Sequence, residues 1–301
     1  MTENTTISNG LLVDELRHWA DDHVLHSNGQ LSLLSYDPER YSGQDGVSVA
    51  GSPQPADLVD SVASLAQPKY HEILELLQAD EKKTGHVSRI GDLLQAGKNV
   101  ALVTNHIDLV DIAITHAAFY SQLNRLGYTM KTGIIISKMV AFLAIQLGDK
   151  MSPAVEILKL LENEQFLSYP RTSSATERGV GSGQHGVTKH NSDMLQRISQ
   201  RLGEGSFLLA IAPSGTIDKP NSDKPNEIIM SRMSNGTLRI LSDSIYTVPV
   251  AVWYGGETPV FKTCDPPRII TDEEMATGVM CKIAQTLTDR VEGKTFVYQT
   301  K

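Results

Sequence analysis

Short apolar runs alternate with helical patterns through most of this chain, and few architectures accommodate such an order of elements. Each run is a compact segment with β-branched residues, which is typical of a strand buried on both faces. Between the runs, apolar residues recur at helical spacing, for example in residues 108–126 and 272–291. This order predicts an α/β fold in which a mixed, mostly parallel sheet is flanked by helices. The expected strands are residues 99–104, 133–136, 166–169, 207–212 and 247–253.

The amino-terminal part of the chain has a different pattern of apolar residues. Apolar residues recur at helical spacing in residues 10–26 and again in residues 58–80, and a stretch rich in Gly, Ser and Pro separates them at 35–55. We therefore expect a helical amino-terminal subdomain in residues 1–85 and an α/β domain in residues 86–301.

Composition excludes several classes of protein. The chain carries 27 Lys and Arg against 35 Asp and Glu, a net charge of −8, which argues against nucleic-acid binding and broad docking on anionic membranes. No apolar run approaches the roughly 20 residues of a membrane-spanning helix, and no amino-terminal signal is visible. Cys264 and Cys281 have no partners at metal-ligand spacing. We expect a soluble, cytoplasmic protein with no metal and no bound cofactor.

A histidine and an aspartate follow the first expected strand. His106 comes directly after that strand, and Asp111 lies five residues further on, in the first turns of the next helix. A carboxylate there can accept the Nδ1 proton of the imidazole, which leaves Nε2 free as a general base. Spacing alone also allows the alternative that His106 caps the helix and Asp111 is a solvated first-turn acid.

Two further strand ends carry polar residues. The strand at 207–212 opens into Pro213-Ser214-Gly215, where backbone N–H groups can form an anion-binding nest and Lys219 can add a charge. The strand at 166–169 leads to Arg171, which is suited to bidentate phosphate recognition. An ordinary turn and a surface arginine are the alternatives for these two segments.

Taken in order, these segments resemble the glycerolipid acyltransferase superfamily, and most closely its soluble, plastid-type glycerol-3-phosphate acyltransferases. Residues 93–106 are similar to the segment that leads into the catalytic histidine of those enzymes, and residues 211–215 read Ile-Ala-Pro-Ser-Gly, as theirs do. Asp218 and Pro220 also match the family pattern. The resemblance covers about residues 87–253.

The resemblance implies an O-acyltransferase of phospholipid biosynthesis. In such an enzyme His106 deprotonates an acceptor hydroxyl, Asp111 orients the imidazole, and the alkoxide attacks a fatty acyl thioester without an acyl-enzyme intermediate. The thioester of acyl carrier protein or coenzyme A is a co-substrate, the acceptor is glycerol 3-phosphate or a related small alcohol, and membrane contact is at most transient. The implied substrate-binding residues are Arg171, Lys189, His190, Ser214, Gly215, Thr216 and Lys219.

The sequence also departs from the family. Plastid-type enzymes continue with Gly-Arg-Asp-Arg after Ser-Gly, whereas this chain has Ile217 at the first arginine and Lys219 at the second. One charge is lost there, and the lysine lacks the bidentate fork of arginine. Residues 172–189 are rich in glycine and form either a lid or a flexible insertion. These departures leave two alternatives: an acyltransferase for another acceptor, such as a lysolipid, an amine or a specialised-metabolite hydroxyl, or a non-catalytic protein that binds acyl carrier or lipid.

Overall fold

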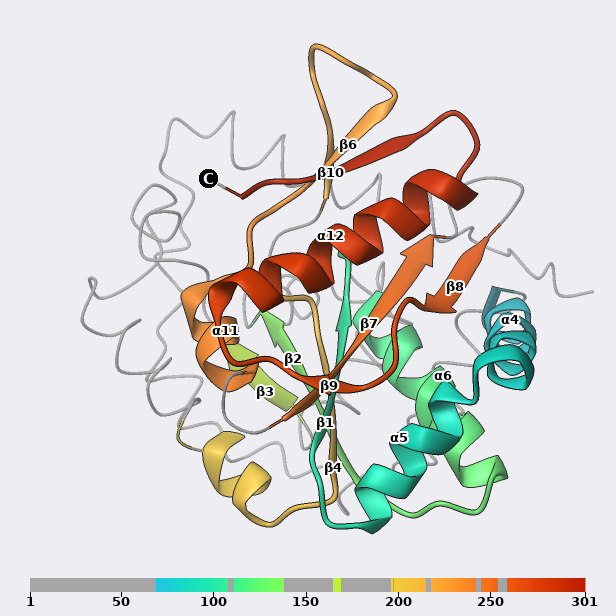
Figure 1. Cartoon of the computed structure of the whole chain (residues 1–301), viewed down its shortest axis with the longest axis vertical. Helices are drawn as coiled ribbons and strands as arrows, with labels where there is room; N and C mark the ends of the chain where they lie inside the picture. Colours follow the sequence, from blue (N-terminus) through green and yellow to red (C-terminus); the bar gives the residue numbers. More distant parts are fainter. Residues whose placement is uncertain are drawn as a thin grey trace, which may run out of the picture.

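A computed structural model of the whole chain shows the fold (Figure 1). The structure describes residues 69–107, 111–137, 165–168, 196, 198–214, 218–241, 245–253 and 259–300. Within these ranges a large sheet carries helices on its faces, and a smaller sheet lies beside it.

The large sheet contains seven strands among the described residues, in the order β3-β2-β4-β1-β7-β8, with β9 also paired to β7. The five strands from β3 to β7 in this order are parallel, and β8 and β9 are antiparallel to β7. The expected mixed, mostly parallel sheet is therefore confirmed. Its strands are β1 (Val100–Thr104), β2 (Lys131–Ser137), β3 (Gln165–Ser168), β4 (Phe207–Ile211), β7 (Tyr246–Trp253), β8 (Val260–Thr263) and β9 (Arg268–Ile269).

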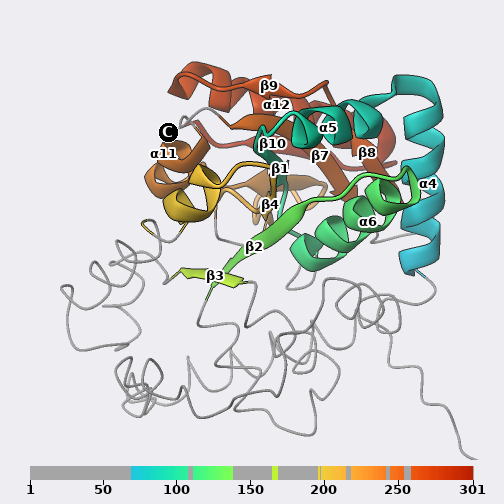
Figure 2. The same ribbon diagram turned by 90° about the horizontal axis from the view of Figure 1, so that it is seen from below.

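Alternate residues of the central strands build two separate cores. In β1, Val100 and Leu102 join one core with residues of the first three described helices. The intervening Ala101 and Val103 join the other core with residues of the last two helices. Because side chains alternate across a strand, helices cover both faces of the sheet, as Figure 2 shows. The helices are α4 (Lys69–Thr84), α5 (His86–Gln95), α6 (Asp111–Arg125), α11 (Asn235–Leu241) and α12 (Glu273–Arg290).

Asn99 aligns the starts of three strands. Its side-chain amide donates to the Leu202 carbonyl (2.8 Å) and accepts from the Phe207 N–H (3.2 Å), while its own carbonyl accepts from Tyr246 N–H (2.9 Å). Since β1, β4 and β7 are neighbouring parallel strands with aligned starts, their carboxyl ends lie together at one edge of the sheet (Figure 1). In parallel sheets, ligands bind outside this edge.

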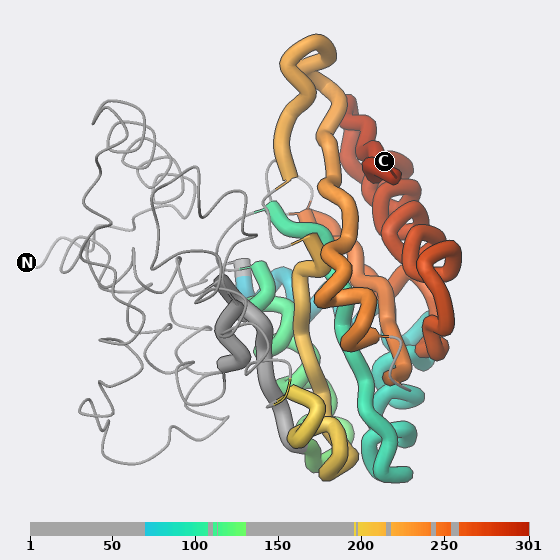
Figure 3. The backbone as a smooth tube through the Cα atoms, turned by 90° about the vertical axis from the view of Figure 1, so that its left-hand side faces the viewer, coloured from blue at the N-terminus to red at the C-terminus, as the bar shows by residue number. Residues whose placement is uncertain are grey.

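The sequence analysis did not anticipate the smaller sheet. It pairs β6 (Glu227–Met230) in parallel with β10 (Thr295–Tyr298) and antiparallel with the short β5 (Lys219–Pro220). The β5–β6 hairpin extends beyond the large sheet (Figure 3). The edge-on ring contact between Trp253, the last residue of β7, and Phe296 (centroids 5.3 Å apart) joins the two sheets at the carboxyl edge of the large one.

Several other expectations can be compared with the structure. The five expected strands and the helices expected in 108–126 and 272–291 are present with boundaries shifted by a few residues. α4 packs into the same core as β1 through Tyr70, Ile73 and Leu77, and the domain boundary after residue 85 stays a prediction. Residues 1–68, which include most of the expected amino-terminal subdomain, lie outside the described residues. In the described part of the chain, we find no helix whose length and apolarity suffice to cross a bilayer.

Candidate active site

The imidazole of His106 is held by Asp111. His106 follows the end of β1 by two residues, and Asp111 is the first residue of α6. The Nδ1 atom of His106 lies 3.1 Å from each carboxylate oxygen of Asp111. The same carboxylate accepts a short hydrogen bond from the Ile107 N–H (2.6 Å). With its Nδ1 proton directed at a carboxylate, the neutral ring presents Nε2 as an acceptor.

Asp111 is fully buried, whereas the His106 side chain is 12% exposed. The alternative of a solvated first-turn acid is therefore wrong: the carboxylate is removed from water and its oxygens are engaged by the ring and the Ile107 N–H. A buried carboxylate that accepts from an imidazole and also from the backbone fixes both the tautomer and the direction of the ring. A pair of this kind is able to act in general-base chemistry.

Asn105 anchors the segment that carries the histidine. The residue is buried, and its amide donates to the Val252 carbonyl (2.8 Å) and accepts from the Val252 N–H (2.9 Å). Both hydrogen bonds reach the neighbouring strand β7, so the chain leaves β1 with a fixed direction. His106 is thereby placed at the carboxyl edge of the sheet by groups that do not touch its ring.

A second carboxylate, that of Asp218, contacts the backbone of His106. Its Oδ2 accepts from the His106 N–H (3.1 Å), and the Asp218 N–H donates to the His106 carbonyl (2.5 Å). The pKa of the Asp218 carboxyl is raised from 3.8 to about 7, chiefly by burial, and the negative charge of Asp111 contributes to the same rise. The hydrogen bond and positive charge of His106 and a hydrogen bond from Asn105 oppose this rise.

The structure describes two of the expected substrate-binding residues. Lys219 follows Asp218 directly, begins β5 and is exposed. Ser214 is buried in the turn after β4, where the Pro213 carbonyl accepts from the Ser234 N–H (2.9 Å). The remaining members lie outside the described residues: Arg171, Lys189, His190, Gly215 and Thr216, together with Ile217 and the glycine-rich segment 172–189.

Other candidate groups for chemistry lie apart from this site. His116 is buried in α6, and burial lowers its pKa to about 4, so it is a neutral core residue at pH 7. Burial raises the pKa of the Cys264 thiol to about 11, which disfavours the thiolate needed for nucleophilic attack. Among the described residues, no group of His, Cys, Asp and Glu side chains is arranged to hold a metal ion.

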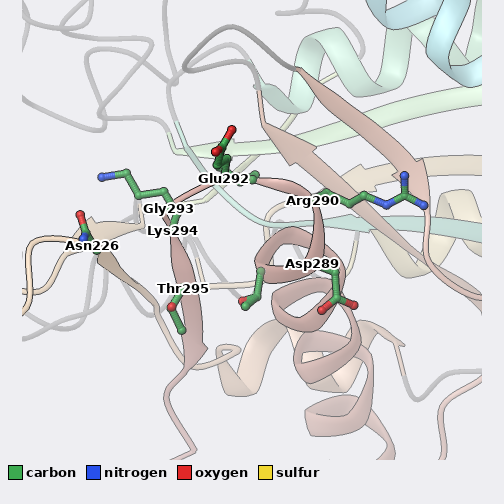
Figure 4. Close-up of a pocket in the computed structure, with 9 residues that line it drawn as sticks. Asn226, Asp289, Arg290, Glu292, Gly293, Lys294 and Thr295 are labelled. Carbon is green, nitrogen blue, oxygen red and sulfur yellow. The ribbon is translucent and has the colours of Figure 1, made fainter.

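A surface pocket of about 630 Å³ lies where α12 ends and β10 begins (Figure 4). Asn226 and residues 288–295 line it, and His106 is not among them. The side chains of Arg290 and Glu292 point in different directions, so no converging set of polar groups is formed there. The pocket lacks the arrangement of a catalytic site.

In comparisons with known proteins, no family model matches the chain. No significant match is found among curated proteins either.

Proposed function

We propose that this protein is an acyltransferase of the glycerolipid type, which moves a fatty acyl group from a thioester to a hydroxyl. The donor is a thioester of acyl carrier protein or coenzyme A, and the acceptor is a small phosphorylated alcohol such as glycerol 3-phosphate. The observation that carries the proposal is the contact between His106 and the fully buried carboxylate of Asp111, at the carboxyl edge of a parallel sheet. The family resemblance of residues 87–253 supplies the reaction class.

In the proposed reaction His106 acts as the base. Its Nε2 accepts the hydroxyl proton of the acceptor while the acceptor oxygen attacks the thioester carbonyl carbon. The carbon–sulfur bond then breaks, and the departing thiolate takes the proton from the imidazolium, so the imidazole returns to its neutral form. The carboxylate of Asp111 stabilises the positive charge on the ring between these two proton transfers.

The test is acceptor-dependent cleavage of a thioester. Purified protein is given palmitoyl thioesters of acyl carrier protein and of coenzyme A, each with and without glycerol 3-phosphate, and free thiol is followed with a thiol reagent. We expect thiol release only when an acceptor is present, and an acyl ester in the product by mass spectrometry. Release that is equal with and without every acceptor tested, or no release at all, would contradict acyl transfer.

Ile217 favours a second candidate, an acyltransferase with a different acceptor. The family has an arginine at this position, and the isoleucine cannot bind a phosphate. The same assay therefore includes a lysolipid, an unphosphorylated diol and an amine as acceptors. A higher kcat/KM with one of these than with glycerol 3-phosphate would assign the acceptor class without changing the chemistry.

Lys219→Ala tests recognition of the acceptor phosphate. A lost charge-assisted hydrogen bond of about 1.5–3 kcal/mol corresponds to a rise of roughly 10- to 100-fold in KM for glycerol 3-phosphate. We expect kcat to stay near its original value. The matched control is Lys224→Ala, which removes an exposed lysine that pairs with Glu227 (3.2 Å) on the same β5–β6 hairpin. An equal KM in both variants would remove Lys219 from the phosphate site.

A further inference from the structure

One residue, Asp218, holds the backbone of His106 at two points. Its carboxylate accepts from the His106 N–H (3.1 Å), and its own N–H donates to the His106 carbonyl (2.5 Å). β1 and β4 are adjacent parallel strands, so the segment that follows β4 lies next to the segment that follows β1. Asp218 as a whole is only 7% exposed, so water competes little for these contacts.

We propose that Asp218 is a positioning residue for His106: it fixes the main chain that carries the imidazole, and its carboxylate charge favours the protonated ring. The inference rests on the proposed role of His106 as the general base. It extends that role because Asp111 acts on the ring and on the Ile107 N–H, whereas Asp218 acts on the backbone of His106 itself.

Burying the charge of Asp218 destabilises the folded protein, and a hydrogen bond from the His106 N–H can form without that charge. Burial raises the pKa of this carboxyl from 3.8 to about 7, so the folded protein loses stability as the pH rises through this interval. An asparagine oxygen also accepts from an N–H, more weakly than a carboxylate but without a buried charge. Among the described residues, the titratable groups that act on this carboxyl are His106 and Asp111, and only His106 gains from a nearby negative charge.

The position of Asp218 also links the base to the proposed acceptor site. Lys219, the proposed phosphate ligand, is the next residue, and Ser214 lies four positions before Asp218. The two backbone contacts therefore hold one end of this segment against His106. A displacement of about 1 Å between a base and its substrate can lower a rate by about a hundredfold.

The experiment compares Asp218→Asn and Asp218→Ala by NMR and kinetics. The full chain is labelled with ¹³C-histidine, the His106 signal is identified by its loss in His106→Asn, and the ring is titrated from pH 5 to 9. We expect the titration midpoint of His106 to fall by about 1 pH unit in Asp218→Asn, since a nearby negative charge is removed. We expect kcat to fall about a hundredfold in Asp218→Ala and less in Asp218→Asn, which keeps an acceptor for the His106 N–H.

Asp80→Asn is the matched control. Asp80 is another buried carboxylate that accepts from a backbone N–H, that of Thr263 (3.1 Å), and from the Thr263 hydroxyl. We expect it to lower the thermal unfolding midpoint without moving the His106 titration or kcat. If Asp218→Ala does not fold, Asp218→Asn still tests the inference. We expect this variant to fold, because loss of the buried charge does not lower stability at pH 8.

The outcomes separate this inference from the proposed function. An unchanged His106 titration in folded Asp218→Asn would overturn the inference, and so would full kcat in both Asp218 variants of an active enzyme. A shifted titration in a protein that transfers no acyl group would support the coupling of Asp218 to His106 and refute the proposed reaction.

Discussion

His106→Ala is expected to lower acyl transfer by about 10³-fold or more, because the proposed reaction loses its general base. The side chain is only 12% exposed, and its removal leaves the buried Asp111 carboxylate without its ring contact. His106→Asn is therefore made in parallel, since its amide can donate to that carboxylate but has no basic nitrogen. Initial rates at saturating thioester and acceptor measure the loss, and thermal unfolding shows that both variants are folded.

The control for this prediction is His86→Ala. The His86 ring is part-buried at the start of α5, and its Nδ1 lies 2.9 Å from the hydroxyl of Thr263 at the end of β8. Neither residue belongs to the proposed site. We expect this variant to keep its turnover. If His106→Asn keeps more than a tenth of the original kcat while folded, His106 is not the base and the proposed mechanism is wrong.

The sequence predicts the five parallel strands of the large sheet, but not β8 and β9, because the parallel strands carry a clear pattern. β1 and β4 are buried at every position, so each reads as an uninterrupted apolar run, and the helices between the strands are long enough to show their own period. Five parallel strands in a row then require helical crossovers, which fixes the fold class.

The strands of the smaller sheet cannot be predicted from the sequence, for a physical reason. Its strands are two to four residues long, and β10 alternates exposed and buried positions over only four residues. Patterns this short are common in loops, and the pairing of β6 with β10 joins segments that are far apart in the chain. No local feature distinguishes them.

In the candidate site, too, local contacts can be expected from the sequence, whereas contacts between distant segments cannot. The contact between His106 and Asp111 is one of two arrangements that their spacing allows, because both residues follow one strand end, and the contact is present. Asp218 follows a different strand, and its hydrogen bonds to His106 depend on β4 lying beside β1. Strand order is a tertiary property that a single sequence does not reveal, so the sequence does not show that Asp218 contacts His106.

Asp111→Asn is expected to lower kcat by on the order of 10³- to 10⁴-fold. Both carboxylate oxygens lie 3.1 Å from Nδ1 of His106, and one of them also accepts from the Ile107 N–H (2.6 Å). In the asparagine variant the amide oxygen keeps the shorter contact with Ile107, so the NH₂ group faces Nδ1. A donor in that position favours the tautomer with its proton on Nε2, and the ring then has no lone pair to offer the acceptor hydroxyl.

This loss is expected in kcat, with little change in KM for either substrate, because Asp111 is fully buried and does not contact them. The matched control is Asp92→Asn, which removes an exposed carboxylate that accepts from the Tyr128 hydroxyl (2.9 Å). It changes the net charge by the same amount and is expected to leave kcat intact. A folded Asp111→Asn protein with kcat within tenfold of the original would show that the carboxylate does not set the tautomer, and the proposed base would then lack its orienting partner.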